Sequence, residues 1–92
     1  MNRESAETVG LTALGWILVD AGRSADFLRL SGASAEDLRA GASDPAFLGF
    51  VLDFLLQSDD AVIDFCDENG LGYDIPARAR RALPGGDAPG WT

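Results

Sequence analysis

The sequence partly repeats itself at an offset of 38 residues, and this repeat limits the folds open to the chain more than any other feature. At this offset residues 14–18 align with residues 52–56, and Gly32 aligns with Gly70. Each copy has apolar residues at helical spacing, followed by a shorter segment that ends at the glycine. Units of this size are typical of helices that bury their apolar faces against a neighbouring unit. The repeat predicts an all-α protein, a compact bundle of five to six short helices in two related halves. Repeated use of one helix pattern without duplication is the alternative.

A central helix is predicted for residues 45–57. A capping aspartate precedes Pro45, which stands where a proline does not disturb a helix. The residues that follow are apolar nearly all round, and only Gly49, Asp53 and Gln57 form a narrow polar stripe. We expect this stripe to face solvent, and a paired position in the core is the alternative for Asp53. Because a helix with so little polar surface is usually buried, we expect the other helices to pack around it.

Capping residues and glycines delimit further helices on both sides of this segment. Ser5, Ser24, Ser34 and Ser58 are the expected N-terminal caps, and Gly22 is expected to end the first helix. We predict one domain over residues 1–83 and a flexible Gly/Pro tail over residues 84–92. The expected helices run from Ser5 to Ala21, from Ser24 to Ser31, from Ala35 to Ala40, from Asp59 to Asn69 and from Asp74 to Leu83.

The charge balance restricts the classes of partner. The chain has 15 acidic residues and seven arginines, without lysine or histidine, so its net charge is −8. Such a charge opposes binding to nucleic acid and to anionic membrane surfaces. It is compatible with a basic protein partner, although we favour a role in solubility alone.

Few residues could support catalysis or hold a metal. Without histidine and lysine the chain lacks the commonest general base and the commonest amine nucleophile. Cys66 is the single cysteine, so it cannot form an intrachain disulfide or a structural zinc site. It lies on the apolar face of its helix beside acidic residues, and we expect a buried, unreactive thiol. We therefore predict a protein that is not an enzyme and holds no cofactor.

The sequence also predicts a soluble, cytoplasmic protein. Residues 1–7 lack the basic and apolar regions of a signal peptide, and the apolar runs are too short to span a bilayer. A single cysteine suits a reducing compartment.

An acidic stripe on the helix at 59–69 is the most distinctive charged feature. Asp60, Asp64 and Glu68 follow one another at intervals of four residues, and Asp67 adds a further carboxylate in the last turn. Like charges at this spacing, and anions at a helix C-terminus, are unfavourable unless something offsets them. We expect the stripe to pair internally with the arginines of the last helix, Arg78, Arg80 and Arg81. The alternatives are a solvated face and a binding site for a basic partner or a divalent cation.

The two tryptophans have different expected roles. Trp16 lies within the first helix, and we expect it to pack in the core against Phe54 or a neighbour. Trp91 lies in the Gly/Pro tail, where it is either a tether that folds back or an exposed anchor for a partner.

Several segments resemble one family of small bacterial proteins, known as domain of unknown function 3572. The resemblance covers most of the chain, and it implies a compact all-helical cytoplasmic protein without an assigned activity. It supplies no catalytic or binding residues. The matching segments are ALGW at 13–16, DFLRLSG at 26–32, DLRA at 37–40, DPAFLGFVLDFLL at 44–56 and RARRALPGG at 78–86.

From these observations we predict a non-enzymatic interaction or regulatory module, which presents an acidic surface or a groove between helices to a protein partner. The tentative surface comprises Asp60, Asp64, Asp67, Glu68 and Trp91. One alternative is a homo-oligomeric structural domain, such as a homodimer that covers the surplus apolar surface of helix 45–57. The other is a divalent-metal protein that uses only carboxylates.

Overall fold

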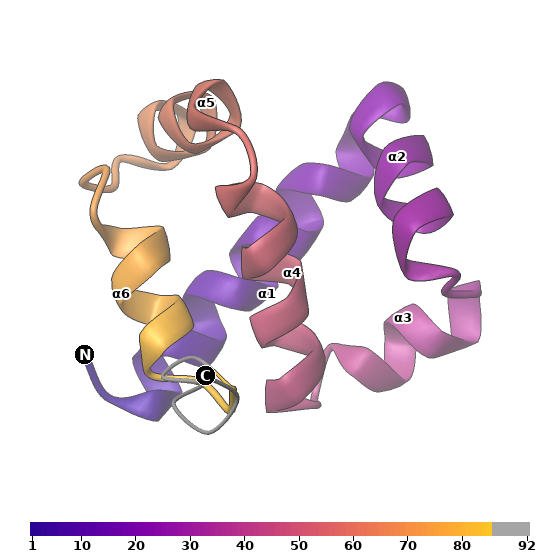
Figure 1. Cartoon of the computed structure of the whole chain (residues 1–92), viewed down its shortest axis with the longest axis horizontal. Helices are drawn as coiled ribbons and strands as arrows, with labels where there is room; N and C mark the ends of the chain where they lie inside the picture. Colours follow the sequence, from indigo (N-terminus) through magenta and orange to yellow (C-terminus); the bar gives the residue numbers. More distant parts are fainter. Residues whose placement is uncertain (86–92) are drawn as a thin grey trace, which may run out of the picture.

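Six α-helices follow one another along residues 1–85, the part of the chain that the computed structural model describes (Figure 1). This part of the chain contains no strand, which confirms the all-α prediction. The helices are α1 (Arg3–Val19), α2 (Ala21–Ser31), α3 (Ala35–Gly41), α4 (Pro45–Leu56), α5 (Asp59–Asn69) and α6 (Ile75–Arg81).

The centre of the molecule consists of α1, α4 and α6, which pack against one another. The other helices lie around this centre: α2 packs against α1, while α3 and α5 pack against α4 (Figure 1). As predicted, α4 is central, and its apolar residues supply a large part of the core. Residues from all three central helices are buried there, among them Ala13, Ile17, Val51, Leu52, Leu55 and Ala79.

The two halves of the repeat share their helix order but differ in packing. In each half a long helix is followed by a second helix that ends at a glycine. Gly32 and Gly70 have φ angles of 66° and 67°, in the left-handed region that favours glycine at a helix C-terminus. The third helices are not equivalent, because α6 packs into the centre on α1 and α4 whereas α3 packs on α4.

The first two helices begin earlier than expected. Asn2, not Ser5, caps α1, because the Asn2 side chain accepts a hydrogen bond from the backbone N–H of Ser5. The first helix then ends at Val19, and Gly22 lies inside α2. Asp20 forms the whole junction, since its N–H donates to the carbonyl of Ile17 while its carboxylate caps α2. Asp20 thus ends the first helix and caps the second, the two roles that we had expected of Gly22 and Ser24.

The remaining caps agree with the sequence. Ser34 and Asp37 form a reciprocal capping box at the start of α3. Asp44 precedes Pro45 at the start of α4, and the Ser58 hydroxyl accepts from the N–H of Ala61 in α5. The last helix ends at Arg81, and buried Leu83 follows it.

The polar stripe of α4 is only partly exposed. Asp53 and Gln57 face solvent, as predicted. Gly49 is buried, contrary to expectation, because the guanidinium of Arg80 and the carbonyl of Pro84 lie over it. A Cβ atom there would lie 2.7 Å from Nη1 of Arg80, so the guanidinium would have to shift if Gly49 were replaced by a larger residue.

Within the described range, no helix combines the length and the apolar character that crossing a membrane requires. Of the predicted tail, Pro84 and Gly85 form a turn, and residues 86–92, with Trp91, lie outside the described residues.

Candidate functional site

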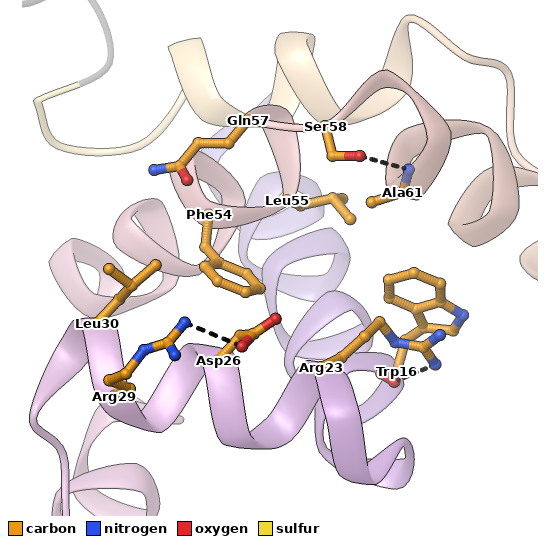
Figure 2. A pocket seen from close by; sticks show the side chains of 10 residues that line it. All are labelled: Trp16, Arg23, Asp26, Arg29, Leu30, Phe54, Leu55, Gln57, Ser58 and Ala61. Atoms are coloured by element: carbon orange, nitrogen blue, oxygen red, sulfur yellow. Dashed lines mark hydrogen bonds and ion pairs between the residues drawn. The ribbon is translucent and has the colours of Figure 1, made fainter.

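The strongest candidate site is a cleft of about 370 Å³ between α2 and the junction of α4 with α5 (Figure 2). One wall is a face of α2, and the other comes from the end of α4 and the first turn of α5. We call this feature the α2–α4/α5 cleft. Its lining residues are Trp16, Arg23, Asp26, Arg29, Leu30, Phe54, Leu55, Gln57, Ser58 and Ala61.

Aromatic side chains between α2 and α4 form a cluster, of which Phe54 lines the cleft. Phe27 of α2 is fully buried, and its ring meets the ring of Phe54 edge to face at a centroid distance of 5.2 Å. The rings of Phe47 and Phe50 lie against Phe27 at 6.1 and 5.8 Å. Offset and edge-to-face contacts of this kind stabilise an aromatic cluster beyond its buried area. The cluster therefore fixes the position of α2 beside α4.

The apolar part of the cleft is open to solvent. Leu30, which lines the cleft, is 57% exposed. Phe54 of α4 is half-buried beside it, and buried Leu55 lies on the other side of Phe54, toward Ala61 (Figure 2). This arrangement leaves a small apolar surface into which another side chain could pack.

Arg23 occupies the other end of the cleft in a fixed orientation. Its Cζ atom lies 3.5 Å from the centre of the Trp16 ring, and its Nη2 donates a hydrogen bond of 2.9 Å to the Trp16 carbonyl (Figure 2). A guanidinium stacked on an indole is stabilised by the negative face of the ring. Within residues 1–85 no carboxylate forms an ion pair with Arg23, and its Nε is buried without a hydrogen-bond partner.

Trp16 links the cleft to α5. The indole is 8% exposed, stacks edge to face on Phe65 at 5.7 Å, and donates from Nε1 to Oε1 of Glu68 at 3.0 Å. The prediction of a core tryptophan is confirmed, with Phe65 rather than Phe54 as the aromatic ring against it.

A second arginine lies at the solvent edge of the cleft. Arg29 pairs with Asp26 one turn away on α2 at 3.0 Å, and both side chains are largely exposed. Exposed pairs of this kind contribute little to stability and exchange partners readily.

The structure separates the acidic residues that the sequence had grouped. Asp67 accepts a hydrogen bond of 2.7 Å from the hydroxyl of Tyr73, and Glu68 accepts from Trp16. Asp60 and Asp64 are exposed, and no hydrogen bond joins their side chains to another described residue. Trp91, the fifth predicted site residue, lies outside the described range.

The expected pairing of this stripe with the last helix is wrong for the described residues. Arg80 donates to Asp53 at 2.6 Å, and Arg78 pairs with Asp74 at 3.4 Å. The reason is the packing of α6 against α1 and α4, which brings Arg80 beside α4 and not beside the stripe. Arg81 makes no ion pair with a described residue.

The carboxylates do not assemble into a metal site in the part of the chain described. No group of three or more acidic or cysteine side chains there has an arrangement that could hold a metal ion. Glu68, which a site on α5 would need, is instead the acceptor for Trp16.

The two groups with shifted acidities lie away from the cleft. Cys66 is fully buried, as predicted, and its Sγ–H donates to the carbonyl of Gly72. Burial, followed by the charges of Asp67 and Asp74, raises the pKa of this thiol above its ordinary value. The hydrogen bond to Asp67, and then the charge of that residue, raise the pKa of Tyr73.

Sequence reasoning missed the cleft residues, above all Arg23 and Leu30. The contact of Arg23 with Trp16 could have been predicted from their spacing, because each lies about one helical turn from the break at Asp20. We did not predict it because we expected the first helix to continue to Ala21.

A comparison with family models identifies the chain. Residues 3–86 match the family described as "Protein of unknown function (DUF3572)". The chain belongs to this family. The match confirms the resemblance found in the sequence and covers all six helices. No curated protein and no solved structure matches the chain.

Proposed function

We propose that this DUF3572 protein is a non-enzymatic interaction module that binds a protein partner in the α2–α4/α5 cleft. The observation that carries the proposal is the combination of exposed Leu30 with Arg23, a fixed guanidinium that has no carboxylate partner among the described residues. Small apolar clefts with a few fixed polar groups are typical binding sites.

The residue types in the cleft support binding more than catalysis. Its ionisable side chains are two arginines and one aspartate, and that aspartate is already paired with Arg29. A nucleophile beside a general base, the usual arrangement for group transfer, is not among the lining residues. Cys66 of α5, the one thiol, is fully buried and does not line the cleft.

A cytoplasmic site of action in a bacterium accords with this proposal. The cysteine is free and buried, which suits a reducing compartment. The bacterial origin rests on the family resemblance.

The acidic face of α5 is a weaker candidate surface than the cleft. Of its four predicted residues, Asp67 and Glu68 are engaged by Tyr73 and Trp16, so only Asp60 and Asp64 are free to meet a basic partner. Exposed carboxylates alone provide steering more than affinity.

The argument for a homo-oligomer also loses support. Helix α4 was expected to have more apolar surface than one chain could cover. Instead Leu48, Val51, Leu52 and Leu55 are buried, and Phe50, at 37%, is the one large apolar side chain of α4 that is exposed.

The proposal is tested by co-purification from cells that naturally express the protein, with three variants. Leu30→Asp places a charge in the cleft, and Leu11→Asp places the same charge at an exposed leucine of α1 that does not line it. The third variant, Asp60→Asn with Asp64→Asn, removes the free charges of α5. We expect a partner that Leu30→Asp loses and the other two variants keep. A partner lost only with the α5 variant would contradict the proposal.

A further inference from the structure

The cleft also indicates the chemistry of its partner. We infer that the partner segment inserts one bulky apolar side chain, with an aromatic ring preferred, and places a carboxylate next to it on Arg23. This inference rests on the proposed binding function and adds the class of segment that is bound. It follows from the size of the cleft, from the aromatic surface that Phe54 contributes, and from the fixed guanidinium of Arg23, which has no carboxylate partner among the described residues.

The volume of the cleft restricts what can enter. At about 370 Å³ it lies at the lower end of the range for binding pockets, which is roughly 300–1,000 Å³. A large side chain fits into such a space, whereas a whole helix cannot enter it. The segment therefore anchors through a side chain and not through a helix laid in the cleft.

The apolar surface of the cleft favours a ring as that anchor. Phe54 is half-buried there, with Leu30 on one side of it and Leu55 on the other (Figure 2). An incoming ring can stack edge to face on Phe54 and extend the cluster that already includes Phe27. An aliphatic anchor would fill the space without this contribution.

Arg23 supplies the charge that selects a carboxylate. Its position is fixed by the stack on Trp16 and by the bond from Nη2, so little conformational entropy is lost when it binds an anion. Its Nη1 makes no hydrogen bond to a described residue and is not buried, and therefore remains free to donate. Arg29 lies in the same cleft and can release Asp26, since both members of that pair are exposed.

The charge of the whole chain limits how many carboxylates the segment carries. With a net charge of −8, the protein repels an acidic segment at long range. The lining of the cleft, with two arginines and one aspartate, is nevertheless positive on balance. A segment with one carboxylate beside its ring, in otherwise neutral or basic surroundings, fits both conditions.

Three small probes with one shared ring test this inference: indole-3-acetate, 3-methylindole and tryptamine, which are anionic, neutral and cationic. Each is titrated into the ¹⁵N-labelled full chain, and amide shifts are followed by NMR. We expect all shifts to centre on residues 23–30 and 54–61, and indole-3-acetate to bind about tenfold more tightly than 3-methylindole, the factor of one charge-assisted hydrogen bond. Tryptamine should bind most weakly.

Two variants identify the charge responsible. Arg23→Gln should reduce the preference for indole-3-acetate to less than about twofold, while Arg39→Gln, which removes an exposed arginine of α3 outside the cleft, should leave it unchanged. The comparison of the three probes on the unaltered chain stands even if Arg23→Gln fails to fold.

The outcomes separate the two proposals. Equal binding of the three probes in the cleft would overturn the inferred partner chemistry and leave the cleft as a binding site. Absence of any shift around the cleft at millimolar probe would overturn both.

Discussion

The indole of Trp16 donates its N–H to the carboxylate of Glu68 at 3.0 Å, and this bond joins α1 to the last turn of α5. A carboxylate at that end of a helix opposes the helix dipole, and it lies one turn from Asp64. The contact explains why an acidic residue stands there. It also holds the ring on which Arg23 rests, so the back of the cleft depends on a residue of α5.

This relationship predicts opposite effects for two neighbouring acidic residues. Glu68→Ala should lower the free energy of unfolding by about 1 kcal/mol, because it leaves the mostly buried indole N–H without an acceptor. Asp64→Ala removes a charge that repels the carboxylates one turn away, and it breaks no side-chain hydrogen bond. It should therefore leave the free energy of unfolding unchanged or raise it by a few tenths of a kcal/mol. Urea unfolding followed by circular dichroism measures both. Equal effects of the two substitutions would show that the bond does not contribute.

Two glycines in helices should respond oppositely to alanine. A Cβ atom at Gly15 of α1 has no neighbour within 4 Å, so Gly15→Ala should stabilise the protein by up to about 1 kcal/mol through helix propensity. At Gly41 the same atom would overlap the ring of Phe47, which is packed against Phe27. Gly41→Ala should therefore cost about 1–3 kcal/mol. Thermal unfolding of both variants is the measurement, and stabilisation by Gly41→Ala would contradict the described packing of α3 on α4.

The single tyrosine reports directly on α5. The hydroxyl of Tyr73 donates to Asp67 at 2.7 Å, which raises the pKa of Tyr73 above its ordinary value of 10.0. Absorbance at the tyrosinate band should titrate above that value in the native chain. Asp67→Asn should lower the midpoint because it removes the negative charge that opposes ionisation, and Asp64→Asn serves as the control. An unchanged midpoint in Asp67→Asn would exclude the hydrogen bond in solution.

The buried thiol predicts a loss of stability at high pH. Burial raises the pKa of Cys66 above 9.0, so between the unfolded and folded values the native state holds a proton that the unfolded chain has released. The contribution of this proton to the free energy of unfolding is therefore fully present below about pH 9. It is lost as the pH rises further, and the free energy of unfolding decreases. The Tyr73 phenol acts in the same direction above its own unfolded value. Urea midpoints at pH 8 and pH 10 should differ less in Cys66→Ala than in the unaltered chain, and an equal decrease in both would contradict this assignment.

Much of the fold could be read from local signals. Ser34, Asp44 and Ser58 begin their helices where the sequence indicated, and Gly32 and Gly70 end theirs, because caps and left-handed glycines act over a few residues. The break at Asp20 was missed because one aspartate both ends α1 and caps α2, a dual role that no propensity scale describes.

The candidate site was less accessible to sequence reasoning, because it depends on which helices meet. The stripe on α5 and the arginines of α6 are close in sequence, yet Arg80 reaches Asp53 of α4 across 27 residues. Likewise Trp16 and Glu68 are 52 residues apart. Pairings over such separations follow from the packing of α1, α4 and α6, which periodicity does not determine.

Site-specific photo-cross-linking in the native cell can show directly whether a partner protein occupies the α2–α4/α5 cleft. A benzophenone amino acid replaces Leu30 in the cleft or, as the control, Leu11, which is similarly exposed at 48%. We expect position 30 to form an adduct with a distinct partner protein, position 11 not to form it, and the adduct to be lost when Arg23→Gln is added. The same adduct from both positions, or an adduct from position 11 alone, would contradict binding in the cleft.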